Sequence, residues 1–168
     1  IDEANFSLGL MHHYGKGKLV SYQEAYDFYY KSAKNNNPEA QFNLGLMERY
    51  GLGRQINLET AFYWFEKAAN MGVKDSQVNL GILYTKGMGV DEDLEQAYKW
   101  FAVAAKGGDN DAGKKRDTVA QAMRPEQLEK ARGEAEIWKP AKIDADANVA
   151  KVQDAWKSGG SPKAATLS

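Results

Sequence analysis

The decapeptide "LGLMERYGLG" at residues 44–53 has two near copies in this chain of 168 residues. One copy, "LGLMHHYGKG", occupies residues 8–17, and the other, "LGILYTKGMG", occupies residues 80–89. Each copy begins 36 residues after the one before it, since 44 − 8 and 80 − 44 both give 36. A fixed internal period of this length is typical of repeat proteins in which every unit is one supersecondary element.

The same period continues outside the decapeptide through positions of matching chemistry. The matching columns are Ala25, Ala61 and Ala97; Phe28, Trp64 and Trp100; Ala33, Ala69 and Ala105; and Asn36, Gly72 and Gly108. Because small and aromatic residues recur in phase, the alanine and aromatic columns are predicted to hold neighbouring units together. Trp64 and Trp100 are therefore expected in the core. Asn36, Gly72 and Gly108 close each unit and suit a left-handed C-cap.

Two helices are predicted in each unit. The first helices are expected to begin near Ala4, Ala40 and Ser76, and the preceding Asn37-Pro38 is a strong helix-start signal. The second helices are expected to open at residues that favour the N-cap position, namely Ser21, Asn57 and Asp93. No stretch of the chain is predicted to form a strand.

Glycines recur at two kinds of position. Gly45 and Gly81 lie inside predicted helices, where glycine costs about 1 kcal/mol relative to alanine. A repeated cost of this kind indicates close approach of the partner helix. Gly51 and Gly53 fall in the link between helices, where glycine readily adopts a positive φ.

The pattern A-x-x-x-L-G-x-x-Y-x-x-G-x-G, followed by A-x-x-[WF]-[FY]-x-x-A-A, resembles the Sel1-like repeat family, which is related to tetratricopeptide repeats. Residues 76–105 match almost throughout, whereas His12 and Glu48 stand where the pattern has Tyr. The resemblance implies an all-α fold, an α/α solenoid of helix-turn-helix repeats. The expected repeats span about 4–36, 40–72 and 76–108, within a domain of residues 1–108.

Residues 109–138 are predicted to form a helical cap. A helix ending near Met123 is broken at Arg124-Pro125, and a second helix follows at 125–138. The positions predicted to face inward are Val119, Ala120 and Met123, then Leu128, Ala131, Ala135 and Trp138. Residues 139–168 are expected to form an extended tail and linker, which either docks along the array through Ile143, Val149, Val152 and Trp156 or remains mobile.

Composition argues against several classes of function. The chain has 22 basic and 23 acidic residues and a net charge of −1, which disfavours nucleic-acid binding. No apolar run is long enough to span a membrane. The histidines, His12 and His13, are adjacent in a helix and cannot jointly chelate a metal, and cysteine is absent. We therefore expect no catalytic residue, no metal and no cofactor, and no enzymatic activity.

Helical geometry predicts a binding surface on the first helices. At about 100° per residue, a second stripe of side chains lies opposite the stripe that contains Leu8 and Leu44. By resemblance to tetratricopeptide arrays, this second stripe implies a concave groove for a protein or peptide partner. The groove residues are Phe6, Leu10, His13, Tyr14, Phe42, Leu46, Arg49, Tyr50, Val78, Ile82, Thr85 and Lys86. For Phe6, Phe42 and Val78, packing between neighbouring first helices is an equal alternative.

A narrower resemblance concerns "RDTVAQAMRPEQLEKARGEAEIWKP" and "NVAKVQDAW", which are similar to the segment after the repeats in the PodJ family of bacterial polar-localisation factors. It implies a periplasmic segment of a membrane-anchored protein with a role in cell polarity or envelope signalling. The start at Ile1 fits an excised piece of such a protein. Direct binding of peptidoglycan, here or through an adjacent module, and a cytoplasmic adaptor are the alternatives.

Overall fold

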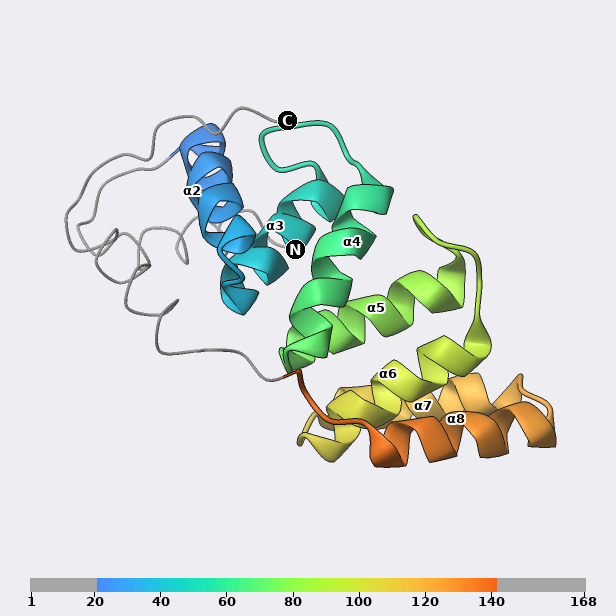
Figure 1. Cartoon of the computed structure of the whole chain (residues 1–168). Helices are drawn as coiled ribbons and strands as arrows, with labels where there is room; N and C mark the ends of the chain where they lie inside the picture. The colour runs from blue at the N-terminus through green and yellow to red at the C-terminus, as the bar shows by residue number, and fades with distance from the viewer. Residues whose placement is uncertain (1–20, 142–168) are drawn as a thin grey trace.

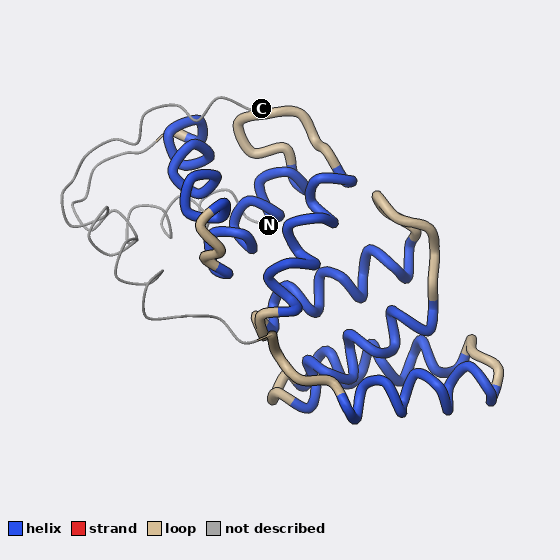
Figure 2. The backbone as a smooth tube through the Cα atoms, viewed as in Figure 1, coloured by secondary structure: helices blue, strands red, loops and turns tan. Residues whose placement is uncertain are grey.

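The computed structural model describes residues 21–141, and that part of the chain contains seven helices and no strand. The predicted all-α class is confirmed (Figures 1 and 2). The helices are α2 (Tyr22–Lys34), α3 (Pro38–Tyr50), α4 (Leu58–Asn70), α5 (Lys74–Lys86), α6 (Leu94–Lys106), α7 (Asn110–Gln121) and α8 (Pro125–Ile137).

Each helix from α2 to α6 packs against the next one in the chain, as expected for a solenoid. The helices succeed one another across the molecule, with α2 at one end and α7 and α8 at the other (Figure 1). The last helix departs from this order, because α8 packs mainly against α6.

The predicted N-caps are present at the second helices. Asn57 accepts a hydrogen bond from the Thr60 amide at 3.1 Å, and Asp93 accepts one from the Gln96 amide at 3.0 Å. Such a cap stabilises a helix by about 1 kcal/mol. The first helix α3 begins at Pro38, as the Asn37-Pro38 signal predicted, whereas α5 begins at Lys74, two residues before the expected start near Ser76. In α3, Asn37 is the N-cap and Pro38 is the first helical residue, a position where the missing amide hydrogen costs nothing.

The second helices are followed by residues in the left-handed region, as predicted. Asn36 has φ of 62°, Gly72 of 97° and Gly108 of 106°. The first helices α3 and α5 end at Gly51 and Gly87, with φ of 67° and 64°. These positions turn the chain from one helix into the next.

The helical glycines are contact points, as predicted. A Cβ atom added to Gly45 would lie 2.5 Å from Cε1 of Phe65, and one added to Gly81 would lie 2.5 Å from Cε1 of Phe101. Each phenylalanine comes from the other helix of the same repeat and is buried. The glycine thus allows an aromatic ring to rest directly on the helix backbone.

Buried side chains form two core clusters. The larger one contains Leu44, Met47, Trp64 and Trp100, and the smaller one is centred on Phe101 near the cap. Trp64 and Trp100 are 8% and 3% exposed, so the prediction that they belong to the core is confirmed. Burying a large apolar side chain contributes about 1.5–3 kcal/mol.

The cap is attached to α6 by polar and aromatic contacts. Lys130 donates to Glu95 at 2.9 Å, and Lys106 pairs with Glu136 at 3.4 Å. The rings of Trp100 and Trp138 meet edge to face, with centroids 6.0 Å apart. Among the positions predicted to face inward, Val119, Ala131 and Ala135 are buried.

The chain after the cap returns to the repeats. The Ala141 amide donates to the carbonyl of Asn70, the last residue of α4, at 2.8 Å. The tail residues predicted to dock, from Ile143 to Trp156, lie outside the described residues.

Candidate functional site

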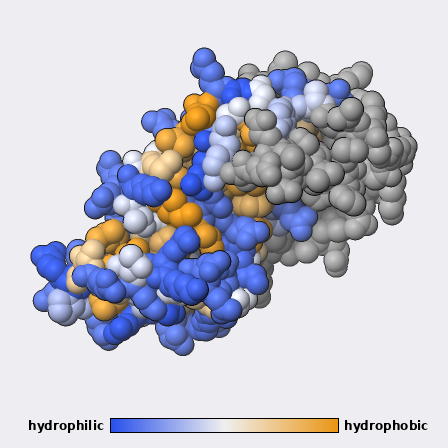
Figure 3. Space-filling view, turned by 180° about the vertical axis from the view of Figure 1, so that it is seen from behind, coloured by the Kyte–Doolittle hydropathy of each residue, from blue (hydrophilic) through white to orange (hydrophobic). Residues whose placement is uncertain are grey.

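A pocket of about 350 Å³ lies where α3, α5, α6 and α7 meet, and we call it the concave pocket. Its lining combines residues from all four helices: Arg49, Ile82, Thr85, Lys86, Phe101, Lys114, Lys115, Thr118 and Val119. Viewed from behind, the molecule shows apolar side chains gathered in a band between hydrophilic margins (Figure 3). Four of the predicted groove residues thus lie together in this pocket: Arg49, Ile82, Thr85 and Lys86.

The floor of the concave pocket is apolar. Phe101 and Val119 are 2% and 5% exposed, and Ile82 packs beside them in the smaller core cluster. These side chains are fixed by packing, so the floor is formed in advance of any ligand.

The rim of the concave pocket is basic. Arg49 and Lys86 lie in the last turns of α3 and α5, where a cation complements the helix dipole. Lys114 and Lys115 are exposed on α7. The pocket lining includes no carboxylate. In a chain of net charge −1, this makes the rim a local region of positive potential.

None of these four cations forms an ion pair with another residue in the described range 21–141. Arg49 is oriented by neutral partners, since its guanidinium donates to the Asn79 side-chain oxygen and lies 4.9 Å from the centre of the Tyr50 ring. The positive charges on the rim therefore remain available to an anionic partner.

Other predicted groove residues have different places. Leu46 is buried at 8% exposure in the larger core cluster, which corrects the expectation that a partner could reach it. Phe42 and Val78 are half-buried and pack against the core, Phe42 with its ring 6.1 Å from that of Phe65. Tyr50 is 38% exposed but does not line the pocket. Phe6, Leu10, His13 and Tyr14 lie outside the described residues.

The repeat pattern identifies the family. A model of the Sel1 repeat matches residues 2–37, 38–73 and 74–109. This chain belongs to the Sel1 repeat family. No curated protein matched its sequence.

Two solved structures share the Sel1 repeat architecture. One is c5321, described as a protective antigen of uropathogenic Escherichia coli strains displaying an SLR fold, with 25% identity and a TM-score of 0.69. The match covers 98% of this chain but 34% of c5321, so the chain spans about a third of that protein. The other is a Sel1 repeat protein from Oxalobacter formigenes, with 33% identity and a TM-score of 0.59 over 68% of this chain and 86% of that one.

These matches support the Sel1 solenoid and do not support the narrower resemblance to the PodJ family. A periplasmic or polarity role consequently has no support from them.

The predicted groove did not include the residues that α7 contributes to the concave pocket. The signal was present, because α7 keeps the phase of the Sel1 repeats: adding 36 to Val78 and Ile82 gives Lys114 and Thr118. The predicted groove ended with the third repeat, whereas the structure extends it by one helix into the cap.

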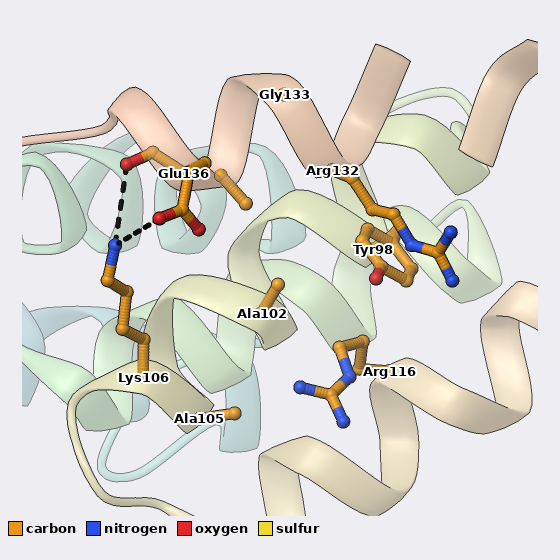
Figure 4. A pocket seen from close by; sticks show the side chains of 9 residues that line it. Tyr98, Ala102, Ala105, Lys106, Arg116, Arg132, Gly133 and Glu136 are labelled. Atoms are coloured by element: carbon orange, nitrogen blue, oxygen red, sulfur yellow. Dashed lines mark hydrogen bonds and ion pairs between the residues drawn. The ribbon is translucent and has the colours of Figure 1, made fainter. Parts of the chain in front are cut away.

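A larger pocket of about 610 Å³ lies between α6, α7 and α8. Ala102 and Ala105 of α6 contribute small side chains to it, and Arg116 and Arg132 approach from α7 and α8 (Figure 4). Lys106 and Glu136 pair across its other end (Figure 4). This pocket mixes charges of both signs, unlike the concave pocket.

One buried carboxylate has a structural role in the Sel1 array. Glu48 is 2% exposed, accepts a hydrogen bond from the Tyr26 hydroxyl at 2.9 Å, and lies 3.5 Å from Nε of Arg54. Burial and the Glu48 carboxylate raise the pKa of Tyr26 above its usual value. The cluster links α2, α3 and the loop that follows α3.

Within residues 21–141, no group of three or more His, Cys, Asp or Glu side chains is placed to hold a metal ion. In the same range, no helix has the length and apolar character needed to cross a bilayer. The expectations of no catalytic residue, metal or cofactor stay predictions for the whole chain.

Proposed function

We propose that this chain is a non-enzymatic scaffold that binds a segment of a partner protein in the concave pocket. The observation that carries the proposal is the combination of an apolar, preformed floor with four cations that have no ionic partner in the described range. Such a combination is typical of a surface that recognises a polypeptide by one buried side chain and flanking charges.

The distribution of residues in the repeat supports this proposal. Columns that keep their chemistry, such as Gly45 and Gly81, contact the partner helix. By contrast, the columns of the basic rim vary between repeats, so that Arg49 aligns with Thr85 and Tyr50 aligns with Lys86 at a spacing of 36. Positions released from packing are those at which a solenoid can vary its binding specificity.

The proposal is tested by site-specific photocrosslinking in cells that produce the full chain. A photoreactive residue replaces Thr118, which lines the concave pocket, or Tyr63 of α4, which is 50% exposed and does not line it. We expect discrete protein adducts from position 118 and none of the same proteins from position 63. Equal adducts from both positions, or no adduct from position 118, would contradict the scaffold role.

A periplasmic setting in cell polarity or envelope signalling is a finer proposal. It is supported only by the sequence resemblance of the cap and tail. Fractionation of cells that express the complete gene tests it: recovery in the periplasm is expected, and recovery in the cytoplasm would favour the adaptor alternative.

Direct binding of peptidoglycan is a weaker alternative. Trp64 and Trp100 are buried and Trp138 is half-buried against Trp100, which leaves these rings little surface on which a sugar could stack. Sedimentation of the chain with purified peptidoglycan would revive this alternative.

A further inference from the structure

We infer that the segment bound in the concave pocket is acidic and inserts one large apolar side chain between α5 and α7. This inference rests on the proposed function and specifies the chemistry of the partner.

The acidic character follows from the charge of the rim. Arg49, Lys86, Lys114 and Lys115 come from three different helices, so positive charge approaches the floor from more than one side. A partner without carboxylates would leave these cations without ionic partners, and a basic partner would be repelled. Carboxylates on both sides of the inserted residue would form ion pairs with the cations of the rim.

The single apolar side chain follows from the size and lining of the concave pocket. A volume of about 350 Å³ is at the lower end of the range for ligand pockets, about 300–1,000 Å³. It suits one large side chain rather than the whole face of a helix. Ile82, Phe101 and Val119 form the surface that this side chain would contact.

Phosphate groups would also be attracted to four cations, so nucleic acid is the competing class of ligand. The apolar floor favours a peptide, because single-stranded nucleic acid is held by stacking on exposed aromatic faces. Phe101, the aromatic residue of the lining, is only 2% exposed and offers no such face.

The test uses the full chain and an array of short synthetic peptides whose net charge varies from strongly acidic to strongly basic. Each peptide is made in two forms, with Phe or Leu at its centre or with Ser there. We expect binding to increase with negative charge, and the Ser forms to bind about tenfold more weakly because they lack an apolar side chain to bury. Tight binders are then measured in solution by fluorescence anisotropy at low and high salt.

Three variants locate the binding. The double substitution Lys114→Glu with Lys115→Glu is expected to weaken acidic peptides about tenfold, and Thr118→Trp is expected to block the pocket to a similar extent. The matched control is Lys31→Glu with Lys139→Glu, exposed positions outside the pocket that change the net charge by the same amount. Circular dichroism confirms that each variant keeps its helical content.

The inference is overturned if basic or neutral peptides bind best, if the Ser forms bind as well as the Phe and Leu forms, or if both double variants weaken binding equally. Tighter binding of a single-stranded oligonucleotide that competes with the peptides would overturn it as well. Adducts at position 118 without any binding of acidic peptides would refute the partner chemistry while leaving the scaffold role intact.

Discussion

The repeat hairpin α5–α6 and the cap hairpin α7–α8 differ in how their two helices are held in place. In the repeat, Gly81 lets the ring of Phe101 rest on the backbone of α5. In the cap, the residue 36 positions after Gly81 is Asp117, and α8 packs mainly against α6 instead of closing onto α7. The space between the cap helices remains as the larger pocket.

This difference shows which interaction makes a Sel1 hairpin. An aromatic ring seated on a glycine holds the two helices of a repeat at close distance. The cap lacks that contact. Both of its helices pack on α6 through the smaller core cluster, which includes Val119 and Ala131, and the Trp100–Trp138 contact and two ion pairs add to this attachment. Ion pairs at the surface are individually weak. Because the cap also lacks the contact between a ring and a glycine, we expect it to be less stable than the repeats.

The substitution Gly81→Val tests the contact between ring and glycine in the repeat, and we expect it to change stability the most. A side chain at this position would overlap the buried Phe101 ring, which is 2% exposed and cannot move into solvent. We expect the free energy of unfolding to fall by about 3 kcal/mol, as measured by chemical denaturation. A loss below the error of that measurement would mean that the glycine contact does not hold the hairpin together.

The substitution Trp138→Ala tests the aromatic attachment of the cap. It removes the edge-to-face contact with Trp100, and we expect a loss of about 1–2 kcal/mol. In this variant, hydrogen exchange should accelerate more in α8 than in α4. The variant Trp138→Phe, which keeps an aromatic ring, is the conservative control. Equal acceleration in both helices would show that the cap and the repeats unfold as one unit.

The substitution Gly133→Ala should act in the opposite direction. No atom lies within 4 Å of a Cβ added at Gly133 in α8, so the alanine meets no obstacle. We expect stabilisation by about 0.5–1 kcal/mol from helix propensity alone, visible as a higher denaturation midpoint. Destabilisation would indicate that α8 is packed more closely than the structure shows.

The smallest expected effect is that of Glu95→Gln. The hydrogen bond and charge of Glu95 raise the pKa of Lys130 above its ordinary value. A raised lysine pKa stabilises the fold below the ordinary pKa, and this contribution disappears as the pH rises through the folded-state value. In the variant, the pKa of Lys130, followed by NMR, should return towards its ordinary value. An unchanged pKa would show that the pair does not persist in solution.

Most of the fold could be predicted because residues with the same structural role recur at the same position in each repeat. The caps at Asn57 and Asp93 and the role of Gly81 follow from local chemistry that recurs in phase. The packing of α8 on α6 could not be predicted in the same way, because it occurs only once and joins residues distant in the sequence.

The candidate site was predicted less completely than the fold. Periodicity identified Ile82 and Lys86, which line the concave pocket. It could not decide that Leu46 is buried while Ile82 is accessible, although the two share a column. Neighbouring helices determine that difference, and a helical projection contains no information about them.

The junction after α6 has a consequence for engineering. Gly108 occupies the left-handed region as Gly72 does one repeat earlier, and each is followed by an extended residue that starts the next first helix. The two junctions are thus interchangeable connectors. A duplicate of residues 74–109 inserted before Asn110 should join without strain, lengthening the array and moving the cap outward with its half of the binding surface.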